Sequence, residues 1–335
     1  MSRAREIADL GGSADAGGIT GRNLIINGAM KVSQRGTSFT ADGYSLDRWY
    51  HQLSGGTSTT TQETFSLGSE VAGFSKYLKQ ATSTGNNYCG LIHKVEDVKS
   101  LPEGKATFSF YAKGTNPAGG SYTVRLARIS RVSPYSTDST PLSSTVTLTS
   151  SWQRFVYTFD VPSFSGLGTV DNTSHLYISI HQADGDTGTA AWELNLTGVQ
   201  LEVGQTATPF EHEDFGTTLA KCQRYYVKFE PQGSYTNYAF GSVTNGTTAE
   251  VHASLPVTMR DEPVIETSAT LGNFRTWDGG GGYTVTSINQ GNYSNLNVGS
   301  INVGCSGGGM TTGRAVKLQD NGVQTGNFIA FKAEL

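Results

Sequence analysis

The stretch NLIINGAMKVSQRGTSF, residues 23–39, decides how the rest of the chain is interpreted. It opens with apolar residues, breaks at Asn27-Gly28, resumes with Met30 and Val32, and then turns polar and basic. Such a short run with glycine inside it does not favour a helix, whereas Asn-Gly between two apolar runs is a strand-and-turn signal. We therefore expect an extended segment here that begins the ordered part of the chain.

Composition sets the broad class of the protein. The 335 residues include 42 glycines, and only 16% are charged, which is fewer than in an average soluble domain. This profile is typical of turn-rich, all-β chains, and the length allows two hydrophobic cores. The formal net charge is -4 and the basic residues are scattered, so nucleic acid is not an expected partner.

Targeting signals are missing from the sequence pattern. No apolar run reaches the roughly 18 residues that span a bilayer, and MSRAREIADL has charges where a secretory signal is apolar. The three cysteines, Cys89, Cys222 and Cys305, are odd in number and far apart, so we expect buried or half-buried free thiols and folding in a reducing cytoplasm. Release by lysis would then bring the protein outside the cell.

Period-two alternation dominates the first two thirds of the chain. ATFSFYAKG, SYTVRLARIS and SWQRFVYTFDVP each place apolar residues on one face of a strand, with turn-rich connections between them. This pattern predicts a β-sandwich. The residues expected in its core are Leu24, Ile26, Phe108, Phe110, Phe155, Tyr157, Leu194 and Leu201.

The remaining third predicts a second β domain. Asn245-Gly246 lies between two strand-like runs and indicates a hairpin, and short strands with Gly and Asn turns follow. A short helix is expected at the junction, in TTLAKCQRYY. The expected organisation is an N-terminal segment at 1–21, a sandwich at 22–212, a linker with a short helix at 213–224 and a C-terminal β-sandwich at 225–335.

Several of these pieces together resemble bacteriophage and prophage tail fibre proteins. They are NLIINGAM, YSLDRWY, FSFYAKG and QLEVGQTATPFE followed by CQRYY. The first domain also resembles the jelly-roll carbohydrate-binding modules, which often open with such a strand and close with Val-Gln-Leu-Glu. The resemblance implies a jelly roll in which Leu24 and Ile26 lie next to Val199 and Leu201. It also implies a homotrimer.

The N-terminal segment 1–21 is interpreted as an anchor. Ser2 can cap a short helix that is too short to be stable alone, so we expect it to order against another virion protein or a sister subunit. The residues expected to dock on the virion are Arg3, Arg5, Ile7 and Leu10.

Motifs for catalysis and metal binding are weak or missing. There is no HExxH pattern, no paired cysteines and no GxSxG elbow, so no metal, no cofactor and no enzymatic activity are expected. Asp184 and Asp186 could present carboxylates to the structural calcium that modules of the resembled type often hold, but a solvated turn is favoured. The HED run at 212–214 is interpreted as a polar junction.

Aromatic residues are the other candidate chemistry, because sugar rings stack on exposed aromatic faces. Strand patterns favour core positions for Trp49, Trp152 and Trp192. In contrast, Trp277 lies in a glycine-rich loop. The candidate glycan contacts are Trp277, Arg275, Asp278, Tyr283 and Tyr293, although packing of these residues on a neighbouring subunit would explain them equally well.

The combined expectation is a non-enzymatic tail fibre of a phage virion that binds a host-surface glycan or protein through its C-terminal domain. Two alternatives stay open. The chain could be a head fibre, capsid decoration or tail connector, or it could be a depolymerase of surface polysaccharide. A cleft with two or more facing carboxylates would favour the depolymerase.

Overall fold

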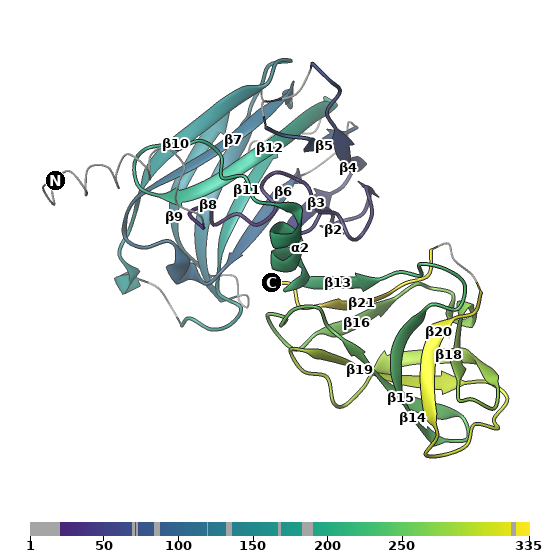
Figure 1. Ribbon diagram of the computed structural model, residues 1–335. Coiled ribbons are helices and arrows are strands. Elements are labelled where there is room, and N and C mark those ends of the chain that lie inside the picture. The colour runs from purple at the N-terminus through teal and green to yellow at the C-terminus, as the bar shows by residue number, and fades with distance from the viewer. Residues whose placement is uncertain are drawn as a thin grey trace, which may run out of the picture. The chain divides into compact units, whose positions relative to one another are not determined.

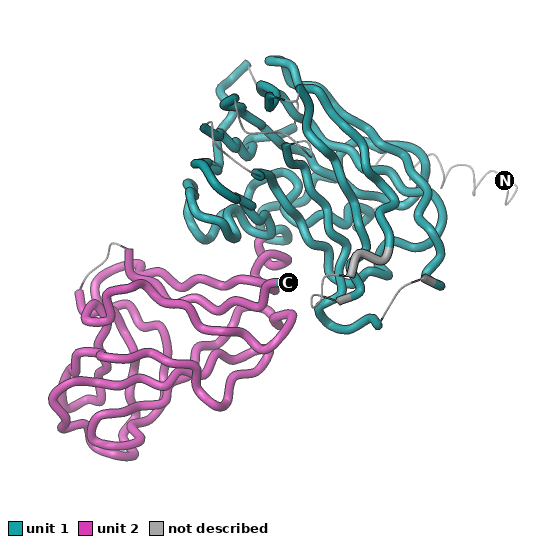
Figure 2. Tube along the Cα trace, turned by 180° about the vertical axis from the view of Figure 1, so that it is seen from behind, with its two compact units in different colours: residues 1–218, 335 teal, residues 219–334 magenta. Residues whose placement is uncertain are grey.

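We analysed a computed structural model of the chain. The structure describes residues 21–68, 71, 73–83, 88–118, 120–131, 136–166, 169–182, 190–322 and 326–335. The chain divides into two compact units, which Figure 2 shows in two colours. Unit 1 comprises residues 1–218 with Leu335, and unit 2 comprises residues 219–334. Each unit is described by itself below.

Unit 1 consists of two antiparallel six-stranded sheets (Figure 1). Sheet A has the order β1-β4-β5-β12-β7-β10, and sheet B has the order β2-β3-β6-β11-β8-β9. The strands are β1 (Ser38–Phe39), β2 (Gly43–Tyr44), β3 (Trp49–Ser54), β4 (Ser58–Thr64), β5 (Lys76–Thr82), β6 (Tyr88–Glu96), β7 (Gly104–Thr115), β8 (Tyr122–Arg131), β9 (Ser136–Val146), β10 (Gln153–Val161), β11 (His175–Gln182) and β12 (Trp192–Val203). Short 3-10 turns occur at Val98–Ser100 and Phe164–Gly166.

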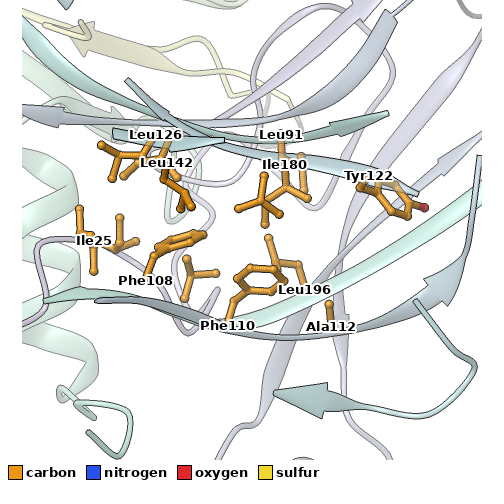
Figure 3. Packing of buried hydrophobic residues seen from close by; sticks show 14 of the residues in the cluster. Ile25, Leu91, Phe108, Phe110, Ala112, Tyr122, Leu126, Leu142, Ile180 and Leu196 are labelled. Atoms are coloured by element: carbon orange, nitrogen blue, oxygen red, sulfur yellow. The ribbon is translucent and has the colours of Figure 1, made fainter. Parts of the chain in front are cut away.

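The core of unit 1 lies between these sheets (Figure 3). Phe108 and Phe110 of β7 project inward from sheet A and face aliphatic residues of sheet B, such as Leu91 and Ile180. Because successive side chains of a strand point to opposite faces, the other residues of each strand are left for the outer surface. The predicted all-β class and the jelly-roll sandwich are thereby confirmed.

Most of the core positions expected from the pattern are correct. Phe108, Phe110, Leu194 and Leu201 are completely buried, whereas three others are half-buried against the core: Leu24, Phe155 and Tyr157. Among residues 24–26 the buried side chain is that of Ile25, and Ile26 is only half-buried. The expected Leu24/Ile26 alternation is therefore wrong at Ile26.

The opening stretch does lie beside the last strand of the sandwich, but not as a regular strand. β5 pairs with β12 only as far as Leu196, and the opening stretch occupies the edge of β12 beyond that point. The Leu24 amide donates to the Leu201 carbonyl (2.9 Å), and the Val199 amide donates to the Gly28 carbonyl (3.0 Å). A regular strand is prevented because Asn27 has a left-handed φ of 58°.

Asn27 shows what the Asn-Gly pair does in this fold. Instead of forming a hairpin, its side chain bonds both backbone groups of Val32 (2.8 and 3.0 Å) and donates to the Asp47 carbonyl (3.0 Å). The Asp47 carboxylate in turn accepts from the backbone and side chain of Gln34, both at 2.6 Å. The NLIINGAM and SLDRWY pieces thus satisfy each other's buried polar groups.

A second polar cluster joins the opening stretch to the QLEVGQTATPFE piece. The buried Glu202 carboxylate accepts from the Thr208 amide (3.0 Å) and hydroxyl (2.6 Å). Gln200 accepts from the Glu211 amide (2.8 Å), and Glu211 accepts from the Asn23 amide (2.8 Å). The residues that make the two pieces distinctive are therefore structural.

A single α-helix, α2 (Phe215–Gln223), lies within the described residues, inside the stretch 213–224 where a short helix was expected. Its first turn is capped by Asp214, whose carboxylate accepts from the Thr217 amide (2.9 Å). The division between the two units falls inside this helix. No helix in the described part of the chain is long and apolar enough to cross a bilayer.

Unit 2 contains a three-stranded sheet and a six-stranded closed barrel. The sheet has the order β13-β21-β16, and the barrel has the order β14-β15-β19-β18-β17-β20. The strands are β13 (Tyr226–Phe229), β14 (Asn237–Asn245), β15 (Thr248–Ser254), β16 (Val264–Thr267), β17 (Phe274–Trp277), β18 (Gly282–Gln290), β19 (Val298–Cys305), β20 (Ala315–Asp320) and β21 (Ile329–Lys332). A 3-10 turn at Leu271–Asn273 precedes β17.

Closure of the barrel is the main difference from the expected C-terminal sandwich. The all-β class is correct, and the Asn245-Gly246 hairpin is confirmed as the link between β14 and β15. Six strands pair in a continuous ring, however, instead of forming two stacked open sheets. Alternation along a strand cannot distinguish these two arrangements, because both need one inward and one outward face.

The three cysteines are free and buried, as predicted. Burial raises the pKa of the Cys89 thiol to about 11, although a hydrogen bond with Ser58 opposes this shift. Burial also raises the pKa of Cys305. Protonated, enclosed thiols of this kind are poor nucleophiles.

Candidate functional site

The outer face of sheet B carries a cleft of about 420 Å³. Its volume falls within the range of small-molecule sites, and its wall contains polar and aromatic side chains together. The strands that form its floor can be followed in Figure 1. The cleft is lined by Asp42, Tyr50, Gln52, Ile92, Lys94, Arg125, Ala127, Ile129 and Tyr177.

Strand register explains why these residues meet. Tyr50 pairs with Ile92, Ile92 with Ser179, and Ser179 with Arg125, so one row crosses β3, β6, β11 and β8. In the next row Lys94 pairs with Tyr177, and Tyr177 with Ala127. Directly paired residues share a face of the sheet. The two tyrosines therefore stand on either side of β6, and two strand spacings combined with a two-residue offset along β6 place their backbones about 12 Å apart.

The floor of the cleft consists of buried apolar side chains. Ala127 and Ile92 are buried, whereas Tyr50, Tyr177 and Arg125 are half-buried and rise around them. Long side chains around a short-chain floor produce a concave surface on a sheet that would otherwise be flat. The cleft thus results from the order of side-chain sizes across four strands.

Tyr50 is held in place by its neighbours. Its hydroxyl donates to the Asp42 carboxylate (2.5 Å), and its ring meets Tyr44 edge to face with 5.3 Å between centroids. Asp42 also accepts from the Leu53 amide (2.9 Å). A ring fixed in this way loses little conformational entropy when a ligand binds.

The chemistry available in the cleft is that of recognition. Aromatic faces can stack on the C–H faces of a sugar ring, while Gln52 and Arg125 supply hydrogen-bond donors for hydroxyl groups. The Lys94 ammonium already donates to the Leu335 carbonyl (2.6 Å). Among the described residues that line the cleft, Asp42 is the one carboxylate, whereas glycoside hydrolysis ordinarily needs a pair. Within the described residues, no group of three or more His, Cys, Asp or Glu side chains could hold a metal ion.

The sequence-predicted glycan contacts lie in unit 2, and the structure brings only two of the five together. Arg275 and Trp277 project from β17, with the guanidinium carbon 5.1 Å from the Trp277 ring centroid. Tyr283 packs against the core of unit 2, and its hydroxyl donates to the Gly309 carbonyl (3.0 Å). Tyr293 is exposed in the turn between β18 and β19.

Asp278 has a structural role. Its carboxylate accepts from the amides of Gly280 (2.9 Å), Gly281 (3.1 Å) and Thr311 (3.3 Å), and it lies 4.0 Å from Arg314. These bonds, chiefly the one from Gly280, lower the pKa of Asp278. Asp278 is buried and shapes the 279–281 turn instead of facing a ligand.

Of the other polar motifs, the HED run at 212–214 takes part in packing, and the rest lie outside the described residues. His212 packs against Phe74 at a tilt and against Phe210 edge to face, with centroids 5.0 Å apart in each case, and its burial lowers the pKa of its imidazole. The remaining candidates lie outside the described residues: Arg3, Arg5, Ile7, Leu10, Asp184 and Asp186.

Sequence reasoning did not find the cleft on sheet B. Its residues occupy outward positions of four strands that are separated by many residues along the chain, and each looks like ordinary surface in its own strand. Only Tyr50 and Tyr177 carried a usable signal, because an aromatic at an outward strand position is open to a ligand.

No family model and no curated protein matches this sequence. Among solved structures, the enzymatically active domain of tailspike protein 4 of bacteriophage CBA120 aligns with 54% of this chain at 11% identity and a TM-score of 0.38. That alignment covers 21% of the tailspike chain. A family 4 carbohydrate-binding module aligns with 46% of this chain and 94% of its own length, at 20% identity and a TM-score of 0.30. The family 11 carbohydrate-binding module of Clostridium thermocellum aligns with 51% of this chain and 98% of its own length, at 14% identity and a TM-score of 0.30.

Proposed function

We propose that this chain is a phage tail fibre protein that binds a host-surface glycan without cleaving it. The observation that carries the glycan-binding part is the cleft on sheet B, where Tyr50 and Tyr177 flank a low floor beside polar side chains. The tail fibre identity, the homotrimer and the location in the virion rest on the sequence resemblance. Binding without catalysis is favoured because Asp42 has no second carboxylate beside it among the lining residues that the structure describes.

The glycan-binding proposal is tested by affinity electrophoresis and calorimetry with host-surface polysaccharide. Tyr50→Ala and Tyr177→Ala should each weaken binding about tenfold, which corresponds to about 1.4 kcal/mol. Tyr77→Ala is the matched control, because it removes a half-buried tyrosine from sheet A of the same sandwich. Equal affinity in all three variants would refute a binding role for the cleft.

Catalysis is tested on the same polysaccharide. The proposal expects no new reducing ends after prolonged incubation with the protein. Release of reducing ends that disappears in Asp42→Asn would refute it and favour the depolymerase.

The virion role is tested on particles. A chain that lacks residues 1–21 should fold and keep its oligomeric mass but should no longer be incorporated into the virion. Normal incorporation of that truncated chain would refute the anchor. Imaging of the intact particle distinguishes a tail fibre from a head fibre, a capsid decoration or a tail connector, because it shows where the chain is attached.

A further inference from the structure

The outer face of the barrel in unit 2 carries aromatic side chains in one row. Trp277 of β17 pairs with Lys317 of β20, and Lys317 pairs with Phe240 of β14. The three residues therefore share a face, with the two rings about 10 Å apart across two strand spacings. Trp277 is 37% exposed and Phe240 is 61% exposed. Exposed aromatics gathered in this way commonly mark a binding surface.

Arg275 adds a cation to this surface. Its guanidinium carbon lies 4.2 Å from the Tyr235 ring centroid and 5.1 Å from that of Trp277, so the charge lies against two aromatic rings at once. Tyr235 comes from the loop before β14, forty residues earlier in the chain, and is 49% exposed. We call Tyr235, Arg275, Trp277, Lys317 and Phe240 the barrel platform.

The charge of the barrel platform is not compensated within the described part of the chain. Neither Arg275 nor Lys317 forms an ion pair there, and the Nε of Arg275 is buried without a hydrogen-bond partner. Two buried carboxylates lie close to Arg275 and Lys317 along the chain, and both accept hydrogen bonds from backbone amides. Asp278 accepts from the 280–281 turn, and Asp320 accepts from the Thr236 amide (2.5 Å). The barrel platform is therefore open to an external anion.

Tyr235 is held in a backbone conformation that it would not adopt by preference. Its φ is 62°, a left-handed value that costs a non-glycine residue about 1–2 kcal/mol. Thr236 stabilises the turn, because its hydroxyl accepts from the amides of Gln232 and Gly233 (both 3.1 Å). A strained residue fixed by its neighbours and exposed to solvent is more common at binding sites than elsewhere.

We propose that the barrel platform binds a polysaccharide whose sugars carry carboxylate groups, such as a uronic or sialic acid polymer. The planar guanidinium of Arg275 would donate two hydrogen bonds to a carboxylate in a bidentate pair, and Lys317 would attract a second carboxylate. Trp277 and Phe240 would stack on sugar rings two strand spacings apart. This site goes beyond the jelly-roll cleft, and its failure would leave the proposal for that cleft intact.

The test is a calorimetric titration of the full chain with oligogalacturonate, alginate and polysialic acid, alongside carboxyl-reduced oligogalacturonate as the neutral probe. At least one acidic probe should bind, and its affinity should be at least tenfold above that of the neutral probe. Arg275→Gln should weaken binding of that acidic probe at least tenfold. Arg275→Lys should retain only part of the affinity for the acidic probe, because lysine keeps the positive charge but lacks the paired N–H donors of the guanidinium. Lys332→Gln is the matched control for charge, since Lys332 is a partly exposed lysine of the same unit, and it should change affinity less than twofold.

Any of several binding results would overturn the proposal. They are failure of all three acidic probes, equal binding of the neutral probe, equal weakening by the Lys332→Gln control, and competition by inorganic phosphate that does not depend on Trp277. A change of oligomeric mass in Arg275→Gln would also overturn it, because the surface would then be an interface between copies. If Arg275→Gln lowers the melting temperature, Trp277→Ala with unchanged melting temperature provides the same comparison.

Discussion

Gly28→Ala tests whether the opening stretch must lie against the last strand of the sandwich. A Cβ at residue 28 would lie 2.1 Å from the Val199 carbonyl oxygen, whereas real Cβ contacts are essentially never under 3.0 Å. The obstructing atom is backbone and cannot rotate away. The same place holds the 3.0 Å hydrogen bond from the Val199 amide to the Gly28 carbonyl.

The expected cost follows from these two contacts. Forced overpacking costs about 1–3 kcal/mol, and loss of the backbone hydrogen bond adds about 0.5–1.5 kcal/mol. We therefore expect Gly28→Ala to lower the free energy of unfolding of unit 1 by roughly 2–4 kcal/mol. For a unit of this size that corresponds to a fall in melting temperature of roughly 4–16 °C.

The assay is urea unfolding followed by tryptophan fluorescence. The chain has four tryptophans, and only Trp277 lies in unit 2, so a Trp277→Phe background makes the signal specific for unit 1. Gly216→Ala is the matched control, because it adds the same methyl group to an exposed helical position, where alanine is favoured over glycine. A loss below 1 kcal/mol in Gly28→Ala, or a loss equal to that of the control, would refute the reasoning.

Three further outcomes follow from the electrostatics and packing of the two units. Burial keeps the pKa of His51 and His93 below the ordinary 6.5, so the unfolded chain takes up protons first as the pH falls below that value. The free energy of unfolding, measured with urea, should therefore be constant above pH 7. Below pH 6.5 it should decline by up to about 1.4 kcal/mol per pH unit for each histidine. A free energy of unfolding that stays constant down to pH 5 would contradict this. The Cys89 thiol, with its pKa raised to about 11, should not react with a thiol reagent until the chain unfolds, which a stopped-flow absorbance trace with and without urea can check. Asp278→Ala should lower the melting temperature of unit 2 near neutral pH, and this loss should shrink as the pH falls below 3.8 and through the depressed pKa of Asp278, because the depressed pKa stabilises the fold only while the carboxylate is ionised. A loss that does not change with pH would argue against the turn-capping role.

Much of the architecture could be read from local patterns. Period-two alternation around Phe108 and Phe110 predicts a sandwich core, because the order of apolar and polar residues along one strand shows which face of that strand is buried. The Asn245-Gly246 hairpin was equally local. The Asn27-Gly28 pair shows the limit of such signals, since the same dipeptide forms a hydrogen-bonded corner there because Val32 and Asp47 supply partners.

Tertiary structure decided both candidate sites. The cleft exists because the register of four strands places Tyr50, Tyr177 and Arg125 around Ala127, and register depends on how whole strands pair. The barrel platform exists because closure of the barrel brings Tyr235 against Arg275. The sequence by itself determined the all-β class, the core faces and the buried thiols, because these depend on residues that are close along the chain. Only the folded chain decided which outward side chains became neighbours, because the pattern along one strand carries no information about the strand that lies beside it.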